Sequence, residues 1–259
     1  MRTTMRTLAV IAVCYCLFST SACKKTSTAH RQKPVVQYKM QQLTCPLNVV
    51  TVQDCSGSIT DNGIDLISPT VFAPYYEDTH RDIQLSFGII SSNSAHSLIT
   101  VELPALWSLE PIAPDLSELP LNKQNEAKYA YWEAITKYKA DTQTFYTDRR
   151  KRYLGFYQCV NSALAPYRSQ LSQETDLTTA VNIADRQLFY WHIPNAANYL
   201  LLLSDGFDSN HRTVQPMKSK AEVILVNANG NKSTNLDRIV TRSMVSVQQA
   251  ISFTLNNHY

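Results

Sequence analysis

Three short segments, far apart in the chain, carry oxygen-bearing side chains at spacings that suit a metal site. Asp54, Ser56 and Ser58 alternate with single residues directly after an apolar run. Thr175 lies far downstream, and Asp205 follows a second apolar run. Hard divalent cations prefer oxygen ligands, and Mg²⁺ keeps several waters when few carboxylates are available. Because most of these side chains are small hydroxyls, the set favours Mg²⁺ or Mn²⁺ over Ca²⁺.

The residues before the first and third segments have the character of buried strands. Residues 47–53 and 199–204 are mostly apolar runs of strand length. In open α/β sheets, ligands bind beyond the carboxyl ends of strands. Residues 54–58 taken alone would also suit a plain turn, because Asp, Ser and Gly are common in turns. The position of both acidic segments at strand ends favours a site instead.

Together the three segments resemble the metal-ion-dependent adhesion site of von Willebrand factor A (vWA) domains. That site has Asp-x-Ser-x-Ser, here at 54–58, then a threonine, here Thr175, and then Asp-Gly, here at 205–206. Residues 174–181 resemble the family's segment around the threonine, although Glu174 stands where glycine is frequent. The resemblance implies a doubly wound α/β fold with a mostly parallel sheet, flanking helices and one antiparallel edge strand.

The resemblance also implies roles for the individual side chains. In vWA domains both serines bind the metal directly, the threonine binds directly or through water, and the aspartates act mostly through water. Ser56, Ser58 and Thr175 are therefore implied to be direct ligands, while Asp54 and Asp205 neutralise charge. Neutral hydroxyls leave the metal electrophilic, so that it can accept a carboxylate from a protein partner. The family thus implies a binding module and not an enzyme.

Residues 1–22 have the organisation of a secretory signal peptide. Two arginines precede an apolar run at 8–18, which is too short for an ordinary membrane-spanning helix. Small residues directly before Cys23 resemble a bacterial lipoprotein signal. That implies cleavage before Cys23, lipid on its sulfur and attachment to the outer membrane of the bacterial envelope. Thr20 replaces the aliphatic residue that is common at its position, so a simply secreted protein is the alternative.

The rest of the chain divides into a tether and a domain. Residues 23–44 are rich in Lys, Thr, Gln and Ser, which predicts a flexible, lipid-anchored tether. Residues 45–259 have the length of one α/β domain with a sizeable core. The formal charge of the whole chain is only +3, which argues against nucleic acid as a partner. We therefore expect a protein partner at the metal and a membrane at the lipid anchor.

Apolar periodicity predicts alternating strands and helices within this domain. Strands are expected at 47–53, 83–91, 97–103, 199–204, 222–227 and 238–242. The third should run antiparallel to the second, because the link between them is short. Helices are expected at 175–190 and 246–255, with a short irregular helix within 62–80.

A long helical insertion is expected around 104–165. Four prolines make 104–120 a loop, and 122–164 has helical composition with an expected break near Gly155 or a protruding helix pair. Aromatic residues recur along this helix, either as a partner-binding face or as the packing of an amphipathic helix. They are Tyr129, Tyr131, Trp132, Tyr138, Phe145, Tyr146, Tyr153, Phe156 and Tyr157. The basic run 149–152 is expected on a solvated helix face.

Cys45, Cys55 and Cys159 remain once the signal and Cys23 are set aside. Their spacing matches no zinc or redox motif. Export permits disulfides, so a Cys45–Cys159 bridge is one option. Cys55 lies within the metal motif and is expected to be a buried thiol.

Two other functions compete with the binding module. The chain would be a structural subunit of an envelope or secretion complex if the metal only stabilised its fold. It would be a hydrolase if Ser56, His211 and Asp205 formed a triad, but the sequence has no Gly-x-Ser-x-Gly nucleophile elbow. Asp208 and His211 follow the third segment and are either ligand contacts or plain loop residues.

Overall fold

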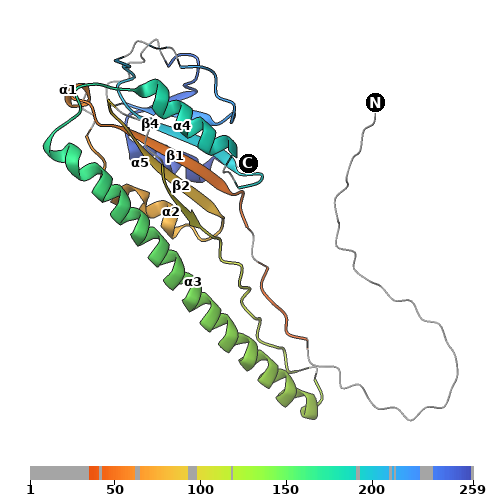
Figure 1. The fold of residues 1–259 in the computed structure, drawn as a ribbon. Coiled ribbons are helices and arrows are strands. Elements are labelled where there is room, and N and C mark those ends of the chain that lie inside the picture. The colour runs from red at the N-terminus through yellow and green to blue at the C-terminus, as the bar shows by residue number, and fades with distance from the viewer. Residues whose placement is uncertain are drawn as a thin grey trace, which may run out of the picture. The chain divides into compact units, whose positions relative to one another are not determined.

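The computed structural model describes residues 35–257 apart from a few short segments. The segments outside the description are 41–42, 62–64, 93–97, 118, 191–192, 210–211, 213 and 228–235. The expected signal peptide, Cys23 and the first part of the expected tether also lie outside the described residues. Figure 1 shows the described chain as a sheet with helices against it.

A six-stranded sheet forms the centre of the domain. Its strands are β1 (Leu47–Asp54), β2 (Ile83–Ile90), β3 (Ile99–Leu103), β4 (Ala197–Leu203), β5 (Glu222–Val226) and β6 (Arg242–Met244). They lie in the order β3-β2-β1-β4-β5-β6, and every neighbouring pair is parallel except β2 and β3. The expected α/β class, with a mostly parallel sheet and one antiparallel edge strand, is confirmed.

Five helices other than α3 (Leu121–Ser169) are described, and hydroxyl side chains cap the start of two of them. They are α1 (Ser58–Asp61), η1 (Pro69–Phe72), α2 (Ala73–Glu77), α4 (Leu177–Tyr190) and α5 (Val247–Asn256). Ser68 caps η1 by accepting from the Thr70 N–H, and Ser246 caps α5 by accepting from the Gln249 N–H at 3.2 Å. Such side-chain oxygens satisfy amide groups that the first helical turn leaves free.

The last strand was expected at 238–242, and this is wrong. The Leu236 carbonyl accepts from the Ile239 and Val240 N–H groups at 3.0 Å each, which makes a turn of this segment. Both Leu236 and Ile239 are buried against the sheet, so their apolar character serves packing and not a strand. Strand β6 begins only at Arg242.

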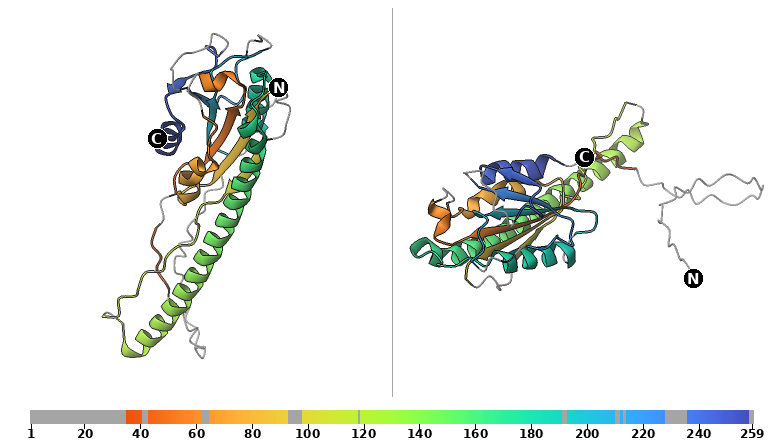
Figure 2. Two further views of the ribbon diagram at one scale, coloured as in Figure 1. Left: turned by 90° about the vertical axis from the view of Figure 1, so that its left-hand side faces the viewer. Right: turned by 90° about the horizontal axis from the view of Figure 1, so that it is seen from above.

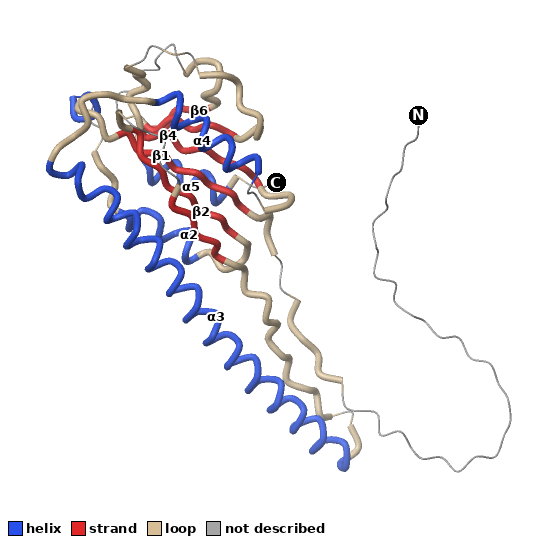
Figure 3. The backbone as a smooth tube through the Cα atoms, in the orientation of Figure 1, coloured by secondary structure: helices blue, strands red, loops and turns tan. Residues whose placement is uncertain are grey.

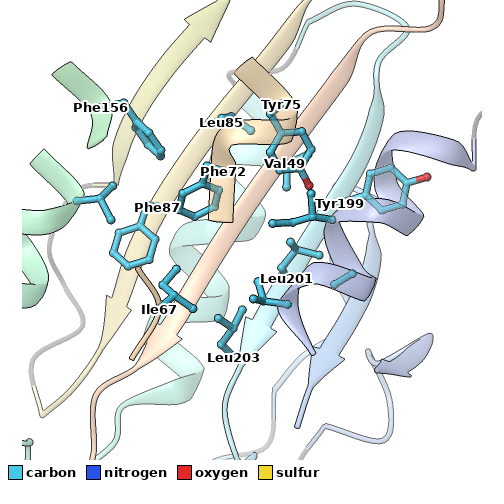
Figure 4. Close-up of a cluster of buried hydrophobic side chains, with 14 of the residues drawn as sticks. Val49, Ile67, Phe72, Tyr75, Leu85, Phe87, Phe156, Tyr199, Leu201 and Leu203 are labelled. Atoms are coloured by element: carbon cyan, nitrogen blue, oxygen red, sulfur yellow. The ribbon is translucent and has the colours of Figure 1, made fainter. Parts of the chain in front are cut away.

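Successive side chains along a strand point to opposite faces of the sheet. The apolar side chains of the two faces therefore enter two separate hydrophobic clusters. One cluster joins Val49 and Leu201 to side chains of η1, α2, α3 and α5. Within it Phe72 meets the rings of Phe87 and Phe156 edge to face, at centroid distances of 6.2 and 5.5 Å (Figure 4). The other cluster joins the alternate strand residues to the apolar side of α4.

Helix α3 (Leu121–Ser169) is continuous over 49 residues, so the expected break near Gly155 is wrong. A Cβ at Gly155 would meet no atom within 4 Å, and glycine costs a helix only about 1 kcal/mol relative to alanine. Packing along the second half of α3 outweighs that cost. Tyr153, Phe156, Val160 and Leu164 recur at helical spacing and enter the first cluster.

The first half of α3 extends beyond the amino end of the sheet, and two extended segments run beside it (Figures 1, 2 and 3). The Lys39 N–H donates to the Glu110 carbonyl at 2.8 Å, and their side chains form an ion pair at 2.6 Å. Residues 35–40, the end of the expected tether, are therefore paired with the proline-rich loop. The aromatic residues of α3 differ in burial between its two halves. Tyr153 and Phe156 in the second half are buried, whereas Tyr129 and Trp132 in the first half are 78% and 62% exposed.

Arg149 is buried and does not lie on a solvated helix face, so that expectation is wrong for this residue. Its guanidinium donates to the carbonyls of Tyr75 and Tyr76 at 2.9 and 2.8 Å, and also to the carbonyls of Asp78 and Pro104. Burial lowers the pKa of Arg149, and the nearby Asp78 carboxylate opposes that shift. One side chain thus joins α3 to the end of α2 and to the segment after β3.

We predict that Arg149→Met lowers the free energy of unfolding by about 3–5 kcal/mol, because four carbonyls lose their donor inside the protein. Arg149→Lys should recover only part of this loss, since an ammonium lacks the planar fork of donors. Urea denaturation measures both. Arg150→Ala, on the exposed side of α3, is the matched control and should change stability by less than about 0.5 kcal/mol. Equal effects at 149 and 150 would contradict this role.

Candidate metal centre

The candidate residues meet at the carboxyl ends of β1 and β4. These two strands are parallel neighbours, with Gln53 opposite Leu203, so Asp54 and the residues after Leu203 emerge side by side. The loop 55–57 leads from β1 into α1, which begins at Ser58. Thr175 comes just before α4, at the same end of the sheet.

The Asp54 carboxylate links the two loops. It is fully buried, and its Oδ1 accepts from the Ser56 N–H at 2.9 Å. Its Oδ2 accepts from the Ser204 hydroxyl at 2.8 Å, and Ser204 Oγ accepts in turn from the Gly206 N–H at 3.0 Å. Sequence reasoning did not single out Ser204, although its place between an apolar run and Asp205 was visible.

The two serines of the motif lie next to each other. Ser56 Oγ and Ser58 Oγ are 3.0 Å apart, with Ser56 buried and Ser58 half-buried. Ser172 holds the loop between them: its carbonyl accepts from the Gly57 N–H at 2.9 Å, and its N–H donates to the Cys55 carbonyl at 2.8 Å. The segment before α4 is thus hydrogen-bonded to the loop 55–57, here called the motif loop. No pattern in the sequence predicts this contact.

Thr175 is tied to the loop after β4. Its N–H donates to Ser209 Oγ at 2.8 Å, and the Ser209 N–H donates to its carbonyl at 2.9 Å. The buried Asp208 carboxylate accepts from the Thr178 hydroxyl at 2.5 Å and from its N–H at 3.2 Å. Asp208 therefore anchors this loop to the first turn of α4, while His211 lies outside the described residues.

These segments surround a pocket of about 490 Å³. Ser56, Ser58 and Thr175 line it together with Phe207 and Ser209. Gly206 turns the loop toward the pocket with φ of 85°, a conformation that other residues adopt at a cost. Phe207 follows it and is 63% exposed, so an apolar ring stands beside the hydroxyl groups.

Electrostatics make the site suitable for a cation. Burial raises the pKa of Asp54 to about 6, and the nearby charge of Asp205 adds to the shift. The donors that bond to Asp54 are the Ser56 amide and the hydroxyls of Ser204 and Ser56, all of them neutral. A divalent cation would compensate both carboxylates, and the oxygen-only set of hydroxyls and carboxylates fits Mg²⁺ or Mn²⁺.

His, Cys, Asp and Glu side chains do not form larger clusters in the part of the chain that the structure describes. No group of three or more His, Cys, Asp or Glu side chains lies close enough there to hold a metal, and the candidate centre itself has two carboxylates. Cys45, Cys55 and Cys159 are free thiols, so the Cys45–Cys159 bridge is not formed. Cys55 is buried, as expected for it.

The structure does not test the hydrolase triad, because His211 lies outside the described residues. Ser56 Oγ has Ser58 Oγ as its neighbour at 3.0 Å. Among the described residues, no histidine lines the pocket that Ser56 shares with Thr175.

Comparison with known proteins adds little. No family model matches the sequence, and no curated protein matches it. Among solved structures, the chain is similar to proximal thread matrix protein 1 from the mussel byssus, at 12% identity and a TM-score of 0.36. The match covers 83% of this chain and 48% of the mussel protein, so the chain spans about half of that structure's length. A likeness at this level carries no conclusion about fold family or function.

We predict that the metal-free protein loses stability as the pH rises from about 4 to 6. The pKa of Asp54 is about 6 in the folded state and near 4 in the unfolded state, so the unfolded chain releases this proton first. The loss attributable to Asp54 is about 3 kcal/mol. Asp54→Asn cannot ionise and should lack this component. Urea denaturation of both proteins in EDTA across this range measures it, and parallel pH profiles would contradict it.

Proposed function

We propose that this protein is a metal-dependent protein-binding module with a doubly wound, vWA-like fold, attached by lipid to the bacterial envelope. One observation carries the proposal: Asp54, Ser56, Ser58, Thr175 and Asp205 are separated in sequence but gather at the carboxyl ends of adjacent parallel strands. The strand order, which turns back between β1 and β4, supports a ligand at this place.

The side chains divide the work between binding the ion and balancing its charge. Ser56, Ser58 and Thr175 face the pocket and would hold the ion directly, while Asp54 and Asp205 lie buried behind them as counter-charges. A bound Mg²⁺ or Mn²⁺ would supply an electrophilic position for a carboxylate of the partner protein. Exposed Phe207 offers that partner an apolar contact beside the ion.

We predict that the metal binds in the micromolar to millimolar range and depends on both carboxylates. Asp54→Ala and Asp205→Ala should each weaken Mg²⁺ or Mn²⁺ binding by roughly tenfold or more, because each removes counter-charge in a buried place. Asp141→Ala, an exposed carboxylate on α3, is the matched control and should bind metal normally. Calorimetry on residues 35–259 gives the affinities. Equal binding by wild type and Asp54→Ala would remove the site.

The role in recognition is tested separately from metal binding. Partner capture from envelope extracts should occur in Mg²⁺ and fail in EDTA, and Thr175→Ala should reduce capture more than it reduces metal affinity. If metal binds but the captured protein stays bound in EDTA, the ion only stabilises the fold and the structural-subunit function replaces this proposal. Phe207→Ala, which leaves the ligand set intact, should weaken capture without changing metal affinity.

The anchor rests on the signal and on Cys23. Among the described residues, no helix combines the length and apolar character that crossing a membrane requires. We propose that lipid on Cys23 supplies the attachment, since several acyl chains give stable anchoring where one is marginal.

We predict that Cys23→Ala abolishes labelling of the protein by a palmitate analogue in cells and releases it from membranes. Cys159→Ala, which removes an exposed thiol within the folded domain, is the matched control and should keep both properties. Equal labelling of Cys23→Ala and wild type would leave secretion without lipid as the explanation of the signal peptide.

A further inference from the structure

A second pocket lies at the opposite, amino end of the sheet. Its volume is about 500 Å³, and four elements contribute to it. Gln84 comes from β2, Glu102 from the edge strand β3, Arg152 from α3 and Tyr190 from the end of α4, while Asp82 precedes β2. No residue of the candidate metal centre lines this pocket.

Gln84 has a side-chain acceptor without a partner. The residue is only 5% exposed, and among the described residues no group donates to its Oε1. The neighbouring amide in the sheet is Asn48, which is fully buried and whose two side-chain polar atoms also have no partner there. Asn198 lies opposite Asn48 on β4, and its Oδ1 also has no hydrogen-bond partner among the described residues. A row of amides thus crosses β2, β1 and β4.

This row is unusual in energetic terms. A buried polar atom without a hydrogen bond costs about 1–3 kcal/mol, and folded proteins keep few of them. Gln84 stands at the end of the row and lines the pocket. A ligand whose hydrogen-bond donor enters beside Gln84 would give the Oε1 at that end of the row a partner.

The charges around the pocket define that ligand further. Glu102 is exposed on β3, and in the described part of the chain neither Glu102 nor Arg152 forms an ion pair. Two carboxylates, Asp82 and Glu102, together with the Gln84 oxygen, attract a positively charged donor. Arg152 attracts an anionic group, and Tyr190 adds an aromatic ring to the lining.

We propose that this pocket binds a small zwitterion of the amino-acid class. Its ammonium group donates to Gln84 Oε1 and faces the carboxylates of Glu102 and Asp82, and its anionic group faces the Arg152 guanidinium. This site is independent of the metal centre, because it lies at the other end of the sheet and uses none of the same residues.

The test uses the full chain in EDTA, so that the metal centre does not contribute. Thermal-shift screening covers each common amino acid and phosphoethanolamine at millimolar concentration, and calorimetry then gives affinities for those that stabilise the protein. At least one zwitterion should bind. Ethylammonium and acetate, which carry one charge each, should bind roughly tenfold more weakly, as loss of one charge-assisted hydrogen bond implies.

Two variants connect binding to the pocket. Gln84→Met removes the acceptor at similar length, and Glu102→Gln removes an exposed charge without touching the core; each should weaken the zwitterion by roughly tenfold. Glu133→Gln, at an exposed position of α3, is the matched control and should bind as wild type does. Absence of any zwitterion binding, equal binding of ethylammonium, or unchanged binding by both Gln84→Met and Glu102→Gln would each overturn the assignment.

Discussion

The buried carboxylate of Asp54 is the point on which the candidate centre depends. It ends the central strand β1, accepts from the loop that follows β1 and accepts from Ser204 at the end of β4. Desolvation makes this carboxylate unfavourable when ionised, and the nearby Asp205 makes it more so. The Ser56 amide and the Ser204 hydroxyl oppose this shift by donating to the ionised carboxylate. Under the function proposed above, a divalent cation on the adjacent hydroxyls would compensate the remaining charge.

The loops that face this point are held by each other as well as by the end of β2. Ser172 bonds to the motif loop on both sides of Ser56, and Ser209 bonds twice to Thr175. A displacement of the motif loop is therefore coupled through Ser172 to the segment before α4, and a displacement of Thr175 is coupled to the loop after β4. Both bonds at Thr175 use its backbone amide and carbonyl groups.

The opposite end of the domain follows a different principle. There the chain leaves the sheet and forms the extension built by the first half of α3, and buried Arg149 fixes this helix through carbonyls of two other segments. A guanidinium can satisfy several carbonyls at once because its donors are planar and diverge. The same region holds the amide row and the pocket around Gln84. The protein thus has polar side chains at both ends of a sheet whose two faces carry hydrophobic clusters.

The sequence by itself determined the alternation of strands and helices, the antiparallel edge strand and the acidic residues at strand ends. Those features depend on local periodicity, on short links and on the order of residues along the chain. The strand predicted at 238–242 was wrong, because Leu236 and Ile239 are apolar side chains that pack against the sheet and do not pair within it. The predicted break of α3 at Gly155 was also wrong, because the contacts that keep this helix continuous come from distant strands and from η1.

Only the tertiary structure decided which side chains meet. Ser204, Ser172 and Ser209 hold the candidate centre, yet each is an ordinary serine in the sequence, since a hydrogen bond between segments leaves no local pattern. Arg149 looked like a surface residue within a basic run, and only the position of α2 beneath it made it buried. The row of Asn48, Gln84 and Asn198 exists because of strand register, which pairs residues far apart in the chain. Local periodicity fixes elements, whereas register and packing between elements fix sites.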